Sequence, residues 1–149
     1  MSTTLQTFLS YAADFEKTLA DDDWSRLAPY FHDDAVYRVE SDLFGCDLEG
    51  PDAIFAGMKK SLDGFDRKFP RREIATQGEP EVDGDEMRVG WQVTYHHDEH
   101  PDFVLRGRST VRMRDGKIAR LIDDYDAAVN DELAAWVKQT GLALDPSYT

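Results

Sequence analysis

An aspartate on an apolar strand face is the residue of this sequence best placed for chemistry. Asp123 lies in the run from Ile118 to Tyr125, which is typical of a short strand. A carboxylate on a buried face is expected to have a raised pKa and could serve as a general base or acid. The alternative is a structural acid at the rim of a pocket, held by a backbone N–H or by another side chain.

Three other side chains could orient a substrate beside this acid, namely Tyr37, Tyr95 and His97. A hydroxyl or an imidazole can donate a hydrogen bond to a substrate oxygen or stabilise charge that develops on it. The alternative for each tyrosine is a half-buried ring whose hydroxyl reaches solvent. We therefore take Asp123, Tyr37 and His97 as candidate catalytic residues. Candidate substrate-binding residues, which would also exclude water, are Tyr95, Trp91, Phe55, Met58 and Phe103.

Histidines cluster at His96, His97 and His100, between two predicted strands. A metal site needs three or four ligands that converge in a fixed geometry. Adjacent histidines on a strand point to opposite faces, so this spacing is weak evidence for a metal. No nucleotide-binding loop is present either. We therefore expect neither a metal nor an organic cofactor.

The first half of the chain predicts two amphipathic helices around a short strand. Apolar residues recur at helical spacing from about Thr4 to Ala20, and a second apolar stripe follows Gly50-Pro51. The acidic run 21–23 is interpreted as the end of the first helix and the cap of a short one carrying Trp24. The segment 35–39 is typical of a strand, and we expect a loop over 41–49.

The second half is predicted to be mainly sheet. Alternation of period two marks strands over 87–97 and 103–114, and 72–77 and 118–125 are further candidates. A terminal helix is expected over 126–140, capped by Asp126 at its start and ended by Gly141. The fold class predicted from these elements is α+β.

The register of the last hairpin decides which acid faces inward. A two-residue turn at Asp115-Gly116 would place Arg108 opposite Asp123 and mix apolar with basic faces. A three-residue turn with a bulge at Gly116 keeps the apolar face continuous. We therefore predict Gly107 opposite Asp123, with Arg106 and Asp124 paired on the other face.

The bulk composition indicates one domain over residues 1–149. The chain has 149 residues, 41% of them hydrophobic, and a net charge of -13. This charge disfavours nucleic acid and anionic membrane surfaces as partners. Cys46 is the only cysteine, and the first residues lack the pattern of a signal peptide. We expect a cytoplasmic protein.

Several stretches in combination resemble the SnoaL-like branch of the NTF2-like superfamily. They are Asp22-Asp23-Trp24, the run 29–37, the run 50–54, and the hairpin that carries Asp115-Gly116 and Asp123-Asp124. The resemblance implies a cone in which N-terminal helices pack on a strongly curved mixed or antiparallel sheet, followed by a C-terminal helix. It also implies a small-molecule pocket and a homodimer formed through the outer sheet face. The fold alone does not give the activity.

The resemblance can be carried over residue by residue. Phe15 and Val39 stand where steroid isomerases have their tyrosine and aspartate, which disfavours that activity. Trp91 and Val93 stand where epoxide hydrolases have an arginine and an aspartate. Asp123 fits the general base of polyketide cyclases.

Two hypotheses remain open. The first is a cofactor-free isomerase, cyclase, dehydratase or hydrolase acting on an apolar oxygenated molecule, with Asp123 moving the proton. The second is a non-catalytic binding or accessory protein that has the same pocket. A tyrosine or histidine within hydrogen-bond reach of Asp123 would favour the first.

Overall fold

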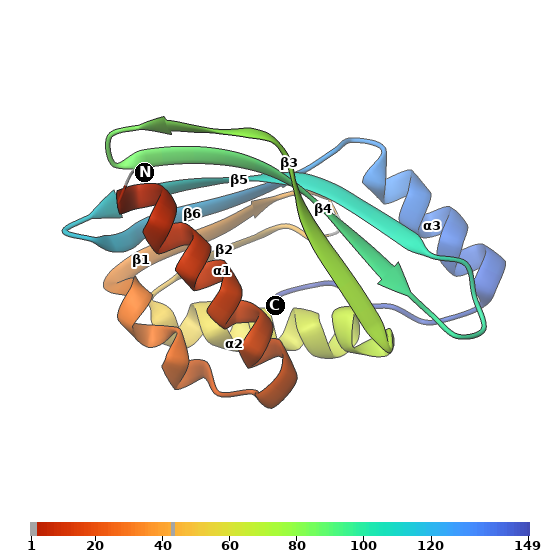
Figure 1. The fold of residues 1–149 in the computed structure, drawn as a ribbon. Helices are drawn as coiled ribbons and strands as arrows, with labels where there is room; N and C mark the ends of the chain where they lie inside the picture. The colour runs from red at the N-terminus through yellow and green to blue at the C-terminus, as the bar shows by residue number, and fades with distance from the viewer. Residues whose placement is uncertain (1–2, 43) are drawn as a thin grey trace.

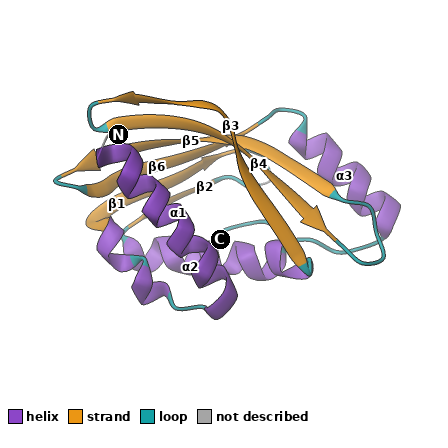
Figure 2. Ribbon diagram, in the orientation of Figure 1, coloured by secondary structure: helices purple, strands orange, loops and turns teal. Residues whose placement is uncertain are grey.

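A six-stranded curved sheet with helices across its concave side makes up the fold (Figures 1 and 2). The computed structural model describes residues 3–42 and 44–149. Three 3-10 turns are η1 (Trp24–Arg26), η2 (Ala28–Tyr30) and η3 (Asp66–Lys68). The other elements are α1 (Thr3–Asp21), β1 (Phe31–Glu40), β2 (Cys46–Glu49), α2 (Pro51–Gly64), β3 (Arg71–Asp83), β4 (Glu86–His96), β5 (Phe103–Arg114), β6 (Lys117–Tyr125) and α3 (Val129–Thr140).

The strand order is β2-β1-β6-β5-β4-β3, and the sheet is mixed because β1 and β6 run parallel while every other pair is antiparallel. The predicted alternation is clearest in β5, where every second residue is buried. The predicted α+β class with a strongly curved mixed sheet is thus confirmed.

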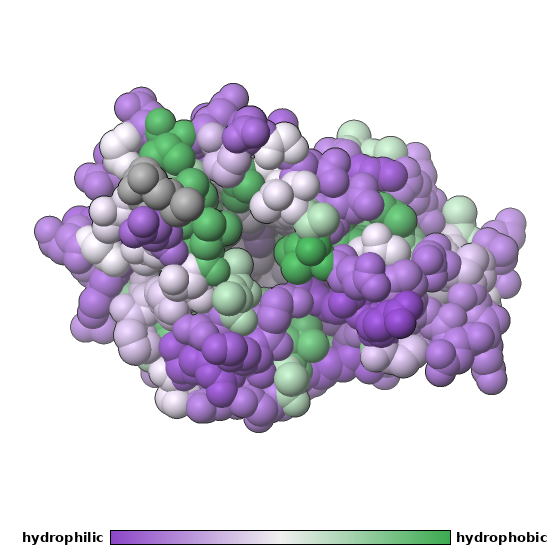
Figure 3. All heavy atoms as spheres, viewed as in Figure 1, coloured by the Kyte–Doolittle hydropathy of each residue, from purple (hydrophilic) through white to green (hydrophobic). Residues whose placement is uncertain are grey.

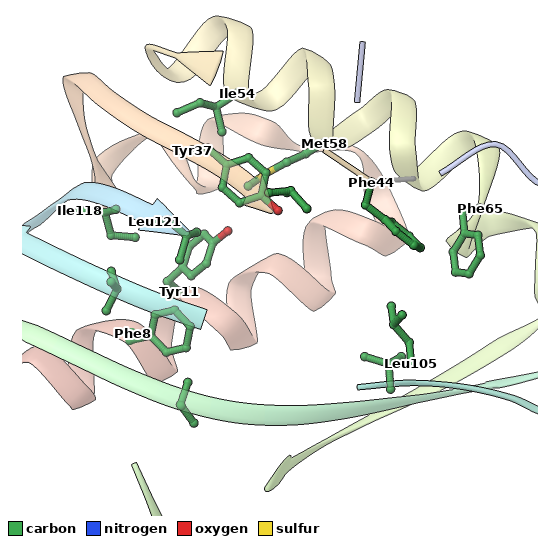
Figure 4. Close-up of a cluster of buried hydrophobic side chains, with 14 of the residues drawn as sticks. Phe8, Tyr11, Tyr37, Phe44, Ile54, Met58, Phe65, Leu105, Ile118 and Leu121 are labelled. Atoms are coloured by element: carbon green, nitrogen blue, oxygen red, sulfur yellow. The ribbon is translucent and has the colours of Figure 1, made fainter. Parts of the chain in front are cut away.

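The core fills the space between the concave face of the sheet and the helices α1 and α2 (Figure 4). Leu27, Ile54, Val111 and Ile118 have no exposed surface, and they come from four different parts of the chain. Among the described residues, no helix combines the length and the apolar character needed to cross a bilayer.

The first two predicted helices match α1 and α2 closely, but the segment after α1 differs. The short helix expected there forms the separate turns η1 and η2. Pro29 lies in the second turn, and because it lacks an N–H it cannot continue a helix from the first.

The loop predicted over 41–49 is wrong in its last four residues. Cys46–Glu49 forms β2, which pairs antiparallel with β1 at the edge of the sheet. An edge strand has one partner only, and its mixed polar sequence carries little strand signal. Strand β3 is also longer than predicted, since it continues through an irregularity around Gly78 to Asp83.

The predicted register of the β5–β6 hairpin is wrong. Its turn has two residues, since Asp115 and Gly116 both have positive φ (52 and 77) and Arg114 pairs with Lys117. This is the favoured geometry for a two-residue turn in a twisted hairpin. The bulge follows the Met113–Ile118 pair, where Ala119 is the extra residue before Arg120 pairs with Arg112.

The bulge preserves the inward direction of Asp123. It places Ser109 opposite Asp123, and Tyr125 opposite Gly107. On the outer face, Arg108 rather than Arg106 pairs with Asp124, at 3.4 Å. One extra residue after a two-residue turn thus has the same effect on the side-chain alternation as the predicted three-residue turn.

Helix α3 begins at Val129, three residues later than predicted, and ends at Gly141 in the left-handed conformation (φ 75) as expected. Asp126 does not cap this helix with its side chain. The capping position is Ala128, and Asp126 contributes its backbone carbonyl, which accepts from the Val129 N–H at 3.0 Å.

After α3 the last nine residues, 141–149, run back along α2 (Figure 1). The Asp145 N–H donates to the Gly64 carbonyl at 2.9 Å, and the Ser61 hydroxyl donates to the Pro146 carbonyl at 2.7 Å. Glycine is required at the contact, because a Cβ on Gly64 would lie 2.1 Å from the Asp145 carbonyl oxygen. We call residues 141–149 the C-terminal strap.

Replacing Gly64 by alanine is expected to detach this strap. Alanine normally stabilises a helix relative to glycine by about 1 kcal/mol, but here we expect a loss of about 1–3 kcal/mol through overpacking. Chemical denaturation gives the stability, and hydrogen exchange of the Asp145 amide reports on the strap.

Ala56→Gly, on the exposed face of α2, is the matched control. It should cost about 1 kcal/mol through helix propensity and leave the Asp145 amide protected. A Gly64→Ala protein that is as stable as the wild type, with the amide still protected, would contradict the expectation.

Candidate functional site

A cavity of about 250 Å³ lies between α1, α2 and the concave face of the sheet. Most of its wall is apolar. Figure 3 shows a hollow on this side of the molecule with hydrophobic residues at its edge. Leu9 of α1 and Ile74 of β3 line the cavity although they are 42% and 49% exposed, so the opening lies between these two elements. This is the concave, mainly apolar kind of site that small molecules occupy.

Asp123 lies in the wall of this cavity and is held by two hydroxyl groups. Ser109 of β5 donates to Oδ1 at 2.6 Å, and Tyr37 of β1 donates to Oδ2 at 2.6 Å. Trp91 of β4 donates from Nε1 to the Ser109 hydroxyl at 3.0 Å. Side chains from four neighbouring strands thus form one hydrogen-bonded network that converges on the Asp123 carboxylate.

Burial controls the electrostatics of this group. It raises the pKa of Asp123 above its ordinary value of 3.8, although the hydrogen bonds from Ser109 and Tyr37 act in the opposite direction. Burial and the Asp123 charge both raise the pKa of Tyr37 well above the usual range. Tyr37 therefore stays protonated and acts as a donor, while Asp123 is the group whose proton occupancy can change.

Tyrosines are concentrated in the cavity wall, which contains five of the six in the chain. Besides Tyr37 and Tyr95 these are Tyr11, Tyr125 and Tyr148. The hydroxyl oxygen of Tyr148 lies 3.4 Å from that of Tyr37, and the two rings meet edge to face with centroids 5.6 Å apart. Burial raises the pKa of Tyr148 to about 12. The C-terminal strap thus contributes a polar group beside Asp123.

A second polar group in the cavity wall is an ion-paired cluster. Arg72 of β3 binds Glu16 of α1 at 2.6 Å and also pairs with Asp66 of η3. Tyr95 donates to the same Asp66 oxygen at 2.9 Å. Burial alone would lower the pKa of Arg72, but Asp66, Tyr95 and Glu16 raise it, so the guanidinium stays charged.

Five of the eight predicted site residues line this cavity. They are Asp123, Tyr37, Tyr95, Trp91 and Met58. Asp123 and Tyr37 are in direct contact, and Trp91 reaches Asp123 through Ser109.

The other three predicted site residues lie outside the lining. His97 follows the last residue of β4, so the strand alternation no longer directs it inward, and its ring lies beside His100 and Phe69. Phe55 packs between Trp24 and Phe31, and Phe103 packs against Phe65, Tyr95 and Trp136. The structure therefore does not bring these three side chains to the cavity, and their contact with a ligand stays a prediction.

The sequence interpretation missed several lining residues for identifiable reasons. Tyr11 continues the apolar spacing of Phe8 and Phe15, so a signal was present. Tyr148 lies in a segment without periodicity, and the partners Arg72 and Glu16 are 56 residues apart, so no local pattern joins them. Within the described part of the chain, no group of three or more metal-ligating side chains could hold an ion.

The profile of the SnoaL-like domain matches residues 12–121 of the chain. No curated protein matches this chain. Among solved structures, an NTF2-like protein of unknown function from Burkholderia pseudomallei has 15% identity and a TM-score of 0.72, over 92% of this chain and 98% of that one. A putative SnoaL-like polyketide cyclase from Jannaschia has 17% identity and a TM-score of 0.67, over 91% and 90%. TerC, co-crystallised with polyporic acid, has 22% identity and a TM-score of 0.66, over 90% and 99%. At these identities the structures share the fold.

The raised pKa of Asp123 predicts how stability depends on pH. The folded protein holds this proton more tightly than the unfolded chain, so unfolding releases it at pH values above about 4. The free energy of unfolding of the wild type, relative to Asp123→Asn, should therefore fall as pH rises from about 4 through the raised pKa. The fall amounts to about 1.4 kcal/mol per unit of pKa difference.

Urea denaturation of both proteins between pH 4 and pH 8 measures this difference, and groups common to both largely cancel. A difference that stays constant, or that grows in favour of the wild type as pH rises, would show that the carboxyl pKa is not raised in the folded state.

Proposed function

This chain belongs to the SnoaL-like domain family, and we propose that its cavity binds a neutral, apolar, oxygenated small molecule on which Asp123 moves a proton. The observation that carries the proposal is the buried Asp123 carboxylate in the cavity wall, with the Tyr37 hydroxyl 2.6 Å from it. A titratable group with a shifted pKa in an enclosed pocket is the arrangement expected of an acid–base catalyst.

The size and wall of the cavity favour a molecule with a ring system. Its volume of about 250 Å³ exceeds what a few waters need. Trp91, Phe44 and Phe65 provide flat apolar surface that would pack against rings. Such a wall also keeps water from the reacting atoms, which strengthens the hydrogen bonds made inside.

The charges of the cavity wall favour a neutral ligand over an anionic one. Among the described lining residues there are three carboxylates, Glu16, Asp66 and Asp123, and a single cationic side chain, Arg72. Arg72 already pairs with two of the carboxylates, so no net positive charge is available to balance a buried anion. A carboxylate or phosphate ligand would be repelled.

The chemistry supported best is a cofactor-free proton transfer, as in an isomerase, cyclase, dehydratase or hydrolase. The ionised form of Asp123 would accept a proton from the substrate, and burial makes it a stronger base than an exposed aspartate. Tyr37 and Ser109 fix the two carboxylate oxygens and so determine which lone pairs remain for the substrate.

One observation favours a second candidate, a non-catalytic binding protein with the same pocket. Both oxygens of Asp123 already accept a short hydrogen bond from the protein, so the carboxylate is satisfied without a ligand. A purely structural role, in which the buried acid joins neighbouring strands, would be enough to explain such an arrangement. The two candidates differ in whether turnover depends on the carboxylate.

A ligand screen with two matched variants distinguishes the candidates. We expect some members of a panel of neutral, apolar, oxygenated ring compounds to raise the melting temperature by about 5–10 °C at 100 times the dissociation constant. Asp123→Asn should retain binding and lose turnover of such a compound by at least about a hundredfold. Thermal shift and product analysis on the same compounds are the measurements.

Asp124→Asn is the control, because Asp124 lies on the outer face, paired with Arg108. Its charge is the smallest of the causes that act on the Asp123 pKa, so binding and most of the turnover should be retained. Binding without turnover in the wild type would leave the non-catalytic candidate. The absence of any ligand in the panel would contradict the small-molecule proposal.

We also propose that two copies of the chain pair through the outer face of the sheet, as the family resemblance implies. That face carries the exposed pairs Arg108–Asp124 and Arg112–Glu86, and such mixed charges can match a second copy. Sedimentation velocity should give a dimer, and Arg108→Glu should shift it towards monomer. A wild type that sediments as a monomer would refute this part of the proposal.

A further inference from the structure

Tyr11 lines the cavity, and its hydroxyl makes no hydrogen bond within the described part of the chain. The residue is 6% exposed and lines the cavity. Among residues 3–42 and 44–149 no hydrogen-bond partner is found for its hydroxyl, whereas Tyr37 donates to Asp123 and Tyr95 donates to Asp66. The oxygen is not among the fully enclosed polar atoms that lack a partner, and Tyr11 lines the cavity, so the hydroxyl opens on the cavity.

The ring of Tyr11, by contrast, is well packed. It contacts Phe8 and Phe15 on α1, and it meets Tyr30 and Phe31 edge to face with centroids 5.8 and 5.5 Å away. Phenylalanine would make the same contacts. Because a hydroxyl in a mainly apolar cavity costs free energy unless it is hydrogen-bonded, the oxygen of Tyr11 is expected to bind a molecule that enters the cavity.

The position of this hydroxyl relates it to Asp123. The charge of Asp123 adds to burial in raising the pKa of Tyr11, so the two groups lie within electrostatic reach. Figure 4 shows the hydroxyls of Tyr11 and Tyr37 directed to the same side of the cluster. Tyr11 belongs to α1 and Asp123 to β6, so helix and sheet each supply one polar group to the cavity.

We propose that the Tyr11 hydroxyl is a substrate-positioning group that donates a hydrogen bond to an uncharged acceptor oxygen, such as a ketone carbonyl, of the molecule in the cavity. This inference rests on the proposed small-molecule function and narrows its ligand class. A hydrogen bond from Tyr11 would give cyclic ketones a higher affinity than hydrocarbons of the same shape, which offer no acceptor. Carboxylates should bind more weakly than ketones, because the three acids of the wall repel them.

The test uses 1-tetralone and tetralin as probes, because they share a skeleton and differ by a carbonyl in place of a methylene. Calorimetric titration of the wild type should give an affinity for 1-tetralone about tenfold higher than for tetralin. Tyr11→Phe should abolish this preference by weakening 1-tetralone alone, and the ligand-free variant should melt at or above the wild-type temperature.

Tyr30→Phe is the matched control. Tyr30 contacts the same ring, but its hydroxyl donates to Asp14 at 2.6 Å and does not line the cavity. This variant should lower the melting temperature of the ligand-free protein and leave the preference for 1-tetralone intact.

Three outcomes would overturn the inference. A tenfold preference that survives in Tyr11→Phe would assign the carbonyl to another donor. Equal weakening of both probes, or a loss of ligand-free stability like that of Tyr30→Phe, would give Tyr11 a packing role only. If neither probe nor any compound of the wider panel binds the wild type, the small-molecule function fails and this inference with it.

Discussion

A carboxylate enclosed by apolar side chains persists only if donors satisfy its oxygens, and the burial of Asp123 is the constraint around which this protein is arranged. Ser109 and Tyr37 provide the two donors, from the strands on either side of β6. The arrangement requires the β5–β6 register that the bulge at Ala119 sets, and it requires β1 to run parallel to β6. A slip of one residue would direct Asp123 to the outer face and leave both hydroxyls without their acceptor.

Space for this network comes from a glycine. A Cβ on Gly107 would lie 2.9 Å from two ring atoms of Trp91, so the absence of a side chain lets the indole lie over β5. From there its Nε1 reaches Ser109 at 3.0 Å. The same ring is part of the apolar wall. One residue therefore supports the acid and shapes the surface that a ligand would contact.

The cavity is closed by parts of the chain that are far apart in sequence. Helix α1 provides Tyr11 and Glu16, the turn η3 provides Asp66, and the C-terminal strap provides Tyr148. The strap, for example, is held outside the cavity by its backbone hydrogen bond to α2 at Gly64. The hydroxyl groups consequently converge on a space that no single element defines, and that of Tyr11 has no hydrogen-bond partner among residues 3–42 and 44–149.

Local patterns in the sequence determined most of the elements, because alternation and helical spacing are properties of adjacent residues. They also determined that Asp123 faces inward, since the apolar face of β6 holds for either hairpin geometry that preserves the alternation. Strand alternation likewise indicated Tyr37, Tyr95 and Trp91 as lining residues, and helical spacing indicated Met58. The profile match over residues 12–121 agrees with the family resemblance seen in the motifs.

Only the tertiary structure decided which of these residues meet. The Asp123–Tyr37 contact spans 86 residues and the Arg72–Glu16 pair spans 56, and no periodicity encodes such distances. His97 was predicted inward by extending the alternation one residue past the end of β4. Tyr148 could not be predicted, because the strap has no regular structure and is placed by the space that the glycines of α2 leave. The physical reason is common to all these cases: local patterns record the direction of a side chain relative to its own element, whereas a site depends on how elements pack against each other.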